Sequence, residues 1–224
     1  MIDISRSVGV FDPSKLKEVI HVIGVGATGS HVVDGLLSLG IRGSKIHVYD
    51  FDTVEEHNIA NQFYTIADVG KPKVSALKEL MLQKYGEEIN IHNTKLESPH
   101  IEGIIFLLVD TFESRLKIFK SLSFKPNVKL VVETRLDARV GQIHLLDPRD
   151  MKHVEWFEKS MPKSDAEDTS EVSACGTRQV ISQTVYMLAG MAIWQLIHWS
   201  VDPTRAGEKI YFATHPWYIE QDRI

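Results

Sequence analysis

Three glycines and an aspartate near the start of the chain have the spacing of a nucleotide-binding turn. Gly24, Gly26 and Gly29 form a GxGxxG pattern that directly follows an apolar run and precedes a helical pattern. The first glycine permits a tight turn, the second lets the backbone approach a phosphate, and the third lets helix and strand pack closely. The free N–H groups of the helix N-terminus attract the anion. Asp50 ends the next apolar run, where a carboxylate would meet a ribose hydroxyl.

A second group of polar residues goes beyond what a dinucleotide site requires. Asn58, Gln62 and Lys73 follow Asp50 in the chain, and Asp110 ends the later apolar run IIFLLV. A nucleotidyl-transfer site must neutralise a triphosphate and stabilise charge on the α-phosphate while pyrophosphate leaves. Lys73 would supply positive charge, and Asn58 and Gln62 would donate hydrogen bonds. Asp110 would hold Mg²⁺. Each residue alone has a structural alternative as a helix cap or a solvated side chain, but their joint order indicates a site.

In combination these residues resemble the ThiF/MoeB/HesA family, the ubiquitin-activating-enzyme-like adenylyltransferases. The motifs that carry the resemblance are GxGxxGS, DxDxVxxxN, GxPK and DxxxxR, the last running from Asp110 to Arg115. The resemblance implies that a carboxylate, usually the C-terminus of a ubiquitin-like or sulfur-carrier protein, attacks the α-phosphate of ATP. An acyl-adenylate and pyrophosphate result. The implied contacts are ribose for Asp50, phosphates for Asn58, Gln62 and Lys73, and Mg²⁺ for Asp110.

The chain departs from this family pattern in two places. Asn61 stands where family members usually carry an arginine, and asparagine supplies neither charge nor a bidentate fork. Arg6 would compensate if the N-terminal segment of a second copy reached the site, and the resemblance implies a homodimer. Without compensation the chain would bind ATP and adenylate slowly. Many relatives also hold zinc through two CxxC pairs, which a chain with one cysteine cannot form, so no zinc is expected.

The single cysteine, Cys175, precedes the last long helical pattern of the chain. A helix N-terminus and the neighbouring Arg178 would favour its thiolate form. In some members of the resembling family a cysteine here forms a thioester or persulfide with the activated partner. The alternative is a small buried residue at a helix start. Elsewhere, Glu133, Arg135 and Asp137 end a predicted strand and would line the acceptor pocket.

The remaining pattern predicts the elements that bring these residues together. Apolar runs alternate with helical patterns, which indicates an α/β fold with a Rossmann-like, doubly wound sheet. The sheet is expected to be mostly parallel with some antiparallel strands, and a long C-terminal helix is expected to follow. Strands are expected at 19–25, 45–51, 89–94, 104–109, 129–133 and 140–145, and helices at 28–39, 68–85, 114–122 and 178–200. Residues 209–213 are expected to add an edge strand. The charged stretch 150–172 is expected to be a mobile crossover loop with a short helix near 154–159.

The composition suits a single domain over the whole chain. It has 224 residues, 43% of them hydrophobic, and a formal charge of −5, which gives no footprint for nucleic acid. The N-terminus lacks an apolar signal region, so a cytoplasmic protein is expected. Residues 184–201 contain no Asp, Glu, Lys or Arg. Polar and small residues interrupt that stretch, so a buried helix is expected there rather than a membrane span.

A NAD-dependent oxidoreductase is the main alternative function. It rests on the glycine turn and Asp50 alone, and it leaves Asn58, Gln62 and Lys73 without a purpose. The chain shows no catalytic Tyr/Lys or His pair at a telling spacing. A catalytically weak ATP-binding scaffold subunit is a further alternative, motivated by Asn61.

Overall fold

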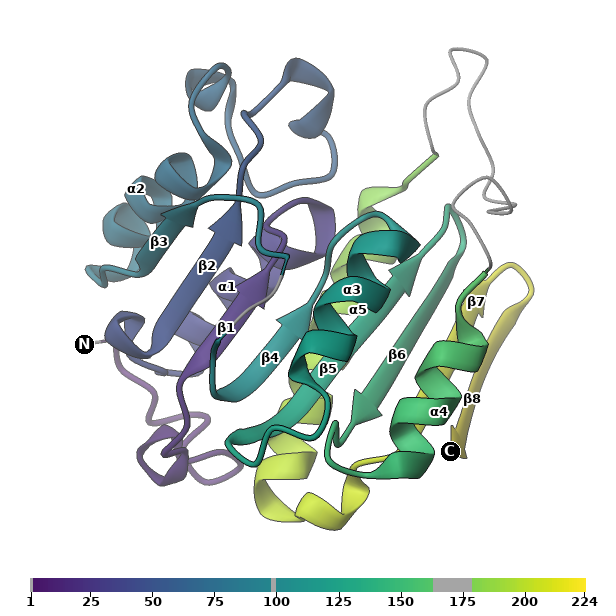
Figure 1. Cartoon of the computed structure of the whole chain (residues 1–224). Helices are drawn as coiled ribbons and strands as arrows, with labels where there is room; N and C mark the ends of the chain where they lie inside the picture. Colours follow the sequence, from purple (N-terminus) through teal and green to yellow (C-terminus); the bar gives the residue numbers. More distant parts are fainter. Residues whose placement is uncertain (1, 98–99, 163–178) are drawn as a thin grey trace.

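One mixed sheet with helices on both faces makes up the protein (Figure 1). The computed structural model describes residues 2–97, 100–162 and 179–224. Within these ranges the strands are β1 Ile20–Ile23, β2 Ile46–Asp50, β3 Asn90–Asn93, β4 Gly103–Leu107, β5 Val128–Leu136, β6 Val140–Leu146, β7 Glu208–Thr214 and β8 Trp217–Arg223. The α-helices are α1 Ala27–Ser38, α2 Lys73–Tyr85, α3 Phe112–Leu122, α4 Met151–Ser160 and α5 Ser182–Val201.

The strand order places a switch point beside β1. The sheet runs β3-β2-β1-β4-β5-β6-β7-β8, and its pairs are parallel from β3 to β5 and antiparallel from β5 to β8. The chain leaves β1 toward β2 on one side, while β4 pairs with β1 on the other. Ligands of doubly wound sheets bind at the carboxyl ends of strands beside such a reversal. The predicted α/β fold is confirmed.

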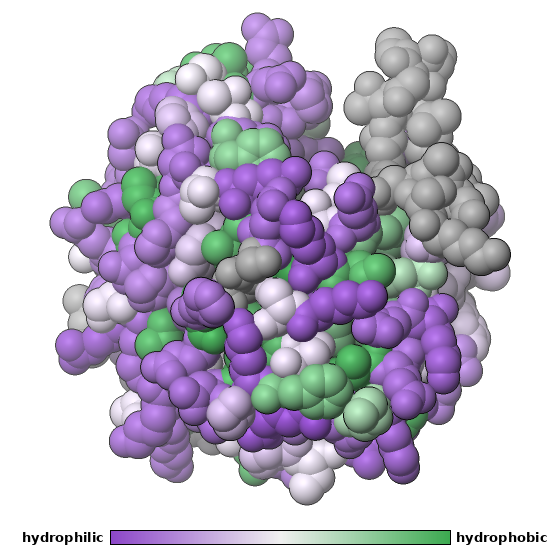
Figure 2. Space-filling model, in the orientation of Figure 1, coloured by the Kyte–Doolittle hydropathy of each residue, from purple (hydrophilic) through white to green (hydrophobic). Residues whose placement is uncertain are grey.

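Two apolar layers hold the helices to the sheet. On one face, α1, α2 and α5 cover the strands, and Val22, Leu36 and Leu196 belong to a single buried cluster. On the other face lie α3 and α4, where the rings of Phe119 and Phe157 have centroids 4.0 Å apart (Figure 1). Successive strand residues point to opposite faces, so the continuous apolar strands serve both layers. The outer surface on the α3 and α4 side is mostly hydrophilic (Figure 2).

Local capping sets the helix boundaries. The helix expected at 68–85 begins only at Lys73, with Pro72 as its N-cap, because residues 66–68 form a separate 3₁₀ turn capped by Asp68. The same helix ends at Gly86, which adopts the left-handed conformation with φ 67°. Thr111 accepts a hydrogen bond from the Ser114 N–H at the start of α3. The helix therefore begins two residues earlier than expected.

The C-terminal third corrects two expectations. The stretch 150–172 was expected to be a loop with a short helix near 154–159; the helix is present but longer, because α4 has ten residues, is capped by Asp150 and is buried through Val154 and Phe157. Residues 163–172 lie outside the described residues. The strand at 209–213 was expected at the edge, but β7 lies inside the sheet, because β8 pairs with it. All seven residues of β8 are exposed, so no alternation of apolar and polar residues marks it.

The uncharged helix α5 is buried against the sheet and α1, as expected. Thr184, Leu188 and Leu196 are among its fully or nearly fully buried residues. Among the helices of the described ranges, none combines the length and hydropathy of a membrane span.

Candidate nucleotide site

The glycine turn joins β1 to α1 at the switch point. Gly24 has φ 90°, and a Cβ there would lie 2.8 Å from the carbonyl oxygen of Leu108, just past β4. A Cβ on Gly29 would lie 1.9 Å from the Gly24 carbonyl oxygen, so the third glycine is required for helix and turn to touch. A Cβ on Gly26 would meet nothing within 4 Å. The backbone of the turn is therefore open to a ligand at Gly26.

Asp50 anchors the turn to the neighbouring strand. Its Oδ2 accepts a hydrogen bond from the Val25 N–H at 2.8 Å, and its Oδ1 accepts one from the Asp52 N–H at 2.9 Å. Burial raises the pKa of this carboxyl, while those two N–H groups and the charge of Lys73 oppose the rise. The carboxylate is thus fixed at the carboxyl end of β2, and each oxygen retains acceptor capacity.

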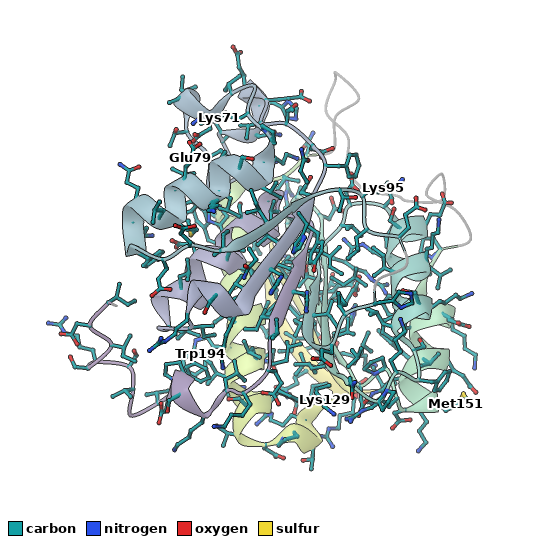
Figure 3. The ribbon with its side chains drawn as sticks, turned by 60° about the vertical axis from the view of Figure 1, so that its left-hand side comes forward. Lys71, Glu79, Lys95, Lys129, Met151 and Trp194 are labelled. Carbon is teal, nitrogen blue, oxygen red and sulfur yellow. The ribbon has the colours of Figure 1, made fainter. Side chains whose placement is uncertain are left out.

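Lys73 places a buried ammonium beside these carboxylates. It is the first residue of α2, and its backbone N–H donates to the Asp52 carbonyl at 2.9 Å. Its Nζ pairs with Asp52 Oδ2 at 2.9 Å, with the lysine side chain 9% exposed and that of the aspartate 48% exposed. Lys71, in the same GKPK stretch, instead pairs with Glu79 on α2 at 2.7 Å (Figure 3). Only the second lysine of the motif therefore belongs to the site.

Two hydrogen bonds fix the segment after β2 against the turn. The Phe63 N–H donates to Ser30 Oγ at 3.0 Å, and the Tyr64 hydroxyl donates to the Val25 carbonyl at 2.7 Å. Both acceptors lie at or just after the β1–α1 turn. The segment that holds the predicted amide residues is therefore held next to the glycines.

The predicted amides have different surroundings. Asn58 is 6% exposed and caps a 3₁₀ turn, with its Oδ1 accepting from the Glu55 N–H at 2.9 Å. This is the structural alternative for Asn58, although its amide donors take no part in that bond. The side-chain oxygens of Asn61 and Gln62 are buried and accept no hydrogen bond within the described residues. Buried groups of this kind require a partner such as water or a ligand.

Asp110 lies at the end of β4 on the same edge of the sheet. Its side chain is exposed, two residues after the Leu108 backbone that contacts Gly24. No group of three or more His, Cys, Asp and Glu residues suited to a metal occurs in the described part of the chain. Asp110 and Asp52 are thus separate carboxylates at the site rather than a preformed metal cage.

Arg115 belongs to a buried ionic cluster. Its Nη1 donates to Glu133 Oε1 at 2.5 Å and also to the Thr134 carbonyl. Glu133 is fully buried, Arg135 Nε contacts its Oε1 at 3.2 Å, and His144 Nδ1 contacts its Oε2 at 2.5 Å. Burial would raise the pKa of Glu133, but Arg135, Arg115 and His144 outweigh it and hold that pKa well below its usual range.

This cluster corrects the expectation that Glu133 and Arg135 line an acceptor pocket. Glu133 has no exposed surface, and Arg135 directs its guanidinium to the carbonyl and hydroxyl of Ser160, at 3.0 and 2.8 Å. Both side chains bind other parts of the protein. Asp137 hydrogen-bonds the Ala138 N–H at 2.7 Å. The cluster therefore has a structural role: its hydrogen bonds and ion pairs connect α3, β5, β6 and α4.

Arg6 does not meet the other site residues within its own chain. It is exposed, and the segment around it packs at the far end of α1, where a Cβ on Gly40 would lie 2.9 Å from the side chain of Ile4. The glycine turn begins α1, a helix of 12 residues and so about 18 Å long. Cys175 and Arg178 lie outside the described residues.

Three residues of the site were not among the sequence candidates. Ser30 and Tyr64 hold the segment after β2, and Asp52 pairs with Lys73. Ser30 and Asp52 occur in the motifs GxGxxGS and DxDxV, which carried a signal for them. Nothing in the sequence marks Tyr64, because its partner lies 39 residues earlier.

Two known proteins are distantly similar to this chain in sequence. Ubiquitin-like modifier-activating enzyme 5 of Caenorhabditis briggsae is 25% identical over 150 residues, covering 58% of this chain and 34% of that protein. The Caenorhabditis elegans protein of the same name is also 25% identical over 150 residues, covering 59% and 35%. The chain thus spans about a third of the length of these relatives.

Solved structures share the fold. PaaA superposes with a TM-score of 0.71 at 18% identity, covering 95% of this chain and 66% of that one. Escherichia coli MccB, in a structure with AMPCPP and MccA, gives a TM-score of 0.72 at 16% identity, covering 94% and 65%. The model of the ThiF family matches residues 7–219, nearly the full length, and the chain belongs to the ThiF family.

Proposed function

We propose that this chain is an ATP- and Mg²⁺-dependent adenylyltransferase that activates a carboxylate as an acyl-adenylate. The observation that carries the proposal is the buried Lys73 ammonium beside Asp52 and Asp50, next to the glycine turn. Adenylyl transfer must offset charge that develops around the α-phosphate, whereas binding a dinucleotide needs no buried cation there. Membership of the ThiF family supports the same chemistry.

In the proposed reaction, a carboxylate oxygen forms a bond to the α-phosphorus, and the bond from that phosphorus to the bridging oxygen of pyrophosphate breaks. The N–H groups at Gly26 and the first turn of α1 would bind phosphate oxygens, and Asp50 would accept hydrogen bonds from the ribose. The Lys73 ammonium would leave its ion pair with Asp52 and bind a phosphate oxygen instead. The side-chain amides of Asn58 and Gln62 would donate hydrogen bonds to phosphate oxygens.

The carboxylates present fit Mg²⁺. This ion is usually held by one or two carboxylates together with substrate phosphates, rather than by a cage of protein ligands. Asp110 is exposed at the switch point and Asp52 is half exposed, which matches that donor set. When bound there, the ion would neutralise phosphate charge.

The acceptor we propose is the C-terminal carboxylate of a peptide or of a ubiquitin-like or sulfur-carrier protein. The names of the similar proteins support this class: one set activates a ubiquitin-like modifier, and MccB was crystallised with ATP and, separately, with MccA. Transfer onward to Cys175 is a further part of the proposal. Cys175→Ser should then abolish any adduct that reducing agents release, and persistence of that adduct would exclude the cysteine.

A homodimer is also proposed, in which Arg6 of one copy would approach the glycine turn of the other. Light scattering of the purified chain tests the dimer. If the dimer forms, Arg6→Ala should weaken ATP binding while the protein remains a dimer. A monomeric chain with full activity would contradict this part of the proposal.

Pyrophosphate exchange into ATP tests the central proposal. Peptides and small carrier proteins with free C-termini should support exchange, while C-terminally amidated peptides, which lack the nucleophile, should not. Asp110→Ala should abolish exchange, and Lys73→Ala should slow it by about 100-fold or more, the scale of one lost electrostatic contact to the transition state.

Lys71→Ala is the matched control for Lys73→Ala. Lys71 lies two residues away, but its partners are the surface residue Glu79 and Asp68, so its removal should leave exchange unchanged. Equal losses in the two variants would count against the assigned role of Lys73.

Thermal unfolding with ATP and with NAD distinguishes the proposed function from the oxidoreductase alternative, since the specific ligand raises the melting temperature. No exchange with any carboxylate, despite ATP binding, would leave the weak scaffold subunit as the better description.

A further inference from the structure

The hydroxyl of Tyr64 reaches the centre of the glycine turn. It donates to the Val25 carbonyl at 2.7 Å, and the tyrosine is 4% exposed. Burial, followed by the charges of Asp50, Asp68 and Asp52, raises the pKa of this phenol well above its ordinary value. The hydroxyl therefore stays protonated and acts as a hydrogen-bond donor at every pH at which the protein would be studied.

The peptide that Tyr64 holds carries the N–H of Gly26. The only cis peptide among the described residues precedes Pro216, so the Val25–Gly26 peptide is trans. In a planar trans peptide the carbonyl and the N–H point in opposite directions. With the carbonyl directed at the buried phenol, the Gly26 N–H is directed away from it. No acceptor for that N–H occurs in the described part of the chain.

The preceding peptide of the turn is fixed separately. Its N–H, on Val25, donates to Asp50 Oδ2 at 2.8 Å. Two side chains, Asp50 and Tyr64, thus hold two successive peptide planes of the turn. Loss of the phenol would leave the Val25 carbonyl buried without its partner, and rotation of the peptide would relieve that cost.

We propose that Tyr64 is a positioning residue of the nucleotide site: its hydroxyl orients the Val25–Gly26 peptide so that the Gly26 N–H is presented to a phosphate oxygen. The proposal rests on the proposed function, since it assumes that a nucleotide phosphate occupies the turn. Tyr64 itself touches no reacting atom.

Tyr64→Phe removes the hydroxyl and keeps the buried ring. The matched control is Tyr85→Phe: Tyr85 is the last residue of α2, and its hydroxyl donates to Asp34 of α1, at 2.7 Å from Oδ1 and 3.1 Å from the carbonyl oxygen. Each variant loses the hydrogen bonding of one hydroxyl group, but only the Tyr64 hydroxyl holds the turn. Calorimetric titration with MgATP gives the dissociation constant, and thermal unfolding without ligand gives the effect on the fold.

We expect Tyr64→Phe to raise the dissociation constant for MgATP about tenfold, the scale of one hydrogen bond, while Tyr85→Phe changes it less than about twofold. The Gly26 amide resonance should shift with ATP in the wild-type chain and much less in Tyr64→Phe. The KM for ATP in pyrophosphate exchange should rise more than kcat falls.

Unchanged ATP affinity in Tyr64→Phe, or equal losses in both variants, would overturn the role of Tyr64 and leave the proposed function intact. Conversely, ATP binding that depends on Tyr64 in a chain that catalyses no exchange would support the positioning role while removing the proposed function. A wild-type chain that binds no ATP would overturn both.

Discussion

Individual residues of this protein are fixed by partners that are distant in the chain, and Glu133 is the strongest case. It is fully buried between Arg115, Arg135 and His144. Removing one member of a buried ionic group leaves the others uncompensated, which costs more than the group contributes when complete.

Glu133→Gln should therefore lower the free energy of unfolding by about 3 kcal/mol or more, because the buried charge of Arg115 loses its partner. Urea denaturation measures the change. Glu158→Gln is the matched control: Glu158 lies 3.7 Å from Lys120 with both side chains largely exposed, so its loss should cost less than about 1 kcal/mol. A cost below about 1 kcal/mol for Glu133→Gln would show that the cluster is dispensable.

At the residue scale, the sequence predicted the positions of residues that are fixed by local spacing in the chain. Gly24, Gly29 and Asp50 lie where the pattern placed them, since a strand, a turn and a helix determine their positions. Glu133 was misassigned, because the end of a strand does not reveal whether the side chain faces a ligand or the interior. That distinction depended on Arg115, a partner on another element.

Among the elements, the unit from β1 through the turn to α1 was the most predictable, and a Cβ on either outer glycine of the turn would clash with backbone. Gly29 nearly touches the Gly24 carbonyl, whereas Gly26 faces open space. The two positions therefore separate the requirements of the fold from those of the ligand.

Gly29→Ala should destabilise the protein by about 2 kcal/mol or more, because its methyl group would lie 1.9 Å from the Gly24 carbonyl oxygen. Gly26→Ala should cost clearly less stability than Gly29→Ala, since an added methyl group at Gly26 meets nothing within 4 Å. It should nevertheless weaken MgATP binding. Urea denaturation and calorimetric titration of both variants check the pair, and a Gly26→Ala variant that binds MgATP normally would contradict the proposed phosphate position.

Two other elements were predicted only in part or not at all: the sequence indicated α4 only as a short helix near 154–159, and it did not indicate β8. Helix α4 is short and rich in charge, so only Val154, Phe157 and the Asp150 cap distinguish it from a loop. Strand β8 is exposed along its whole length, so it lacks the alternation that marks a half-buried strand. Its pairing with β7 depends on the hairpin rather than on burial.

Folding lowers the pKa of several histidines across the molecule. Burial, followed by the charges of His47 and His92, lowers the pKa of His21 to about 4. Its Nδ1 lies 3.0 Å from the Tyr49 hydroxyl, and the rings of Tyr49 and His92 stack with centroids 4.3 Å apart. The pKa values of His31, His47 and His144 are also lowered, with burial the largest cause in each.

Stability should therefore fall on mild acidification. Below the ordinary histidine pKa of 6.5, His21 becomes protonated in the unfolded chain, whereas in the folded protein it stays neutral down to about pH 4. Acidification over this range therefore stabilises the unfolded state relative to the folded state. His21 alone should cost about 2 kcal/mol between about pH 7.5 and about pH 5. His21→Gln should flatten the dependence measured by urea denaturation, while His57→Gln, at an exposed site, should not. A slope unaffected by His21→Gln would exclude this residue as its source.

The position of β7 beside β6 also has a consequence in time. The two strands pair along most of their length, yet α4 and α5 lie between them in the chain. During synthesis β6 therefore emerges long before its neighbour and presents an unpaired edge while the intervening chain is made. Exposed strand edges promote association between nascent chains. The edge of β6 thus stays unpaired until residues 208–214 have been made, so its maturation should depend on translation speed and on chaperones that shield the growing chain.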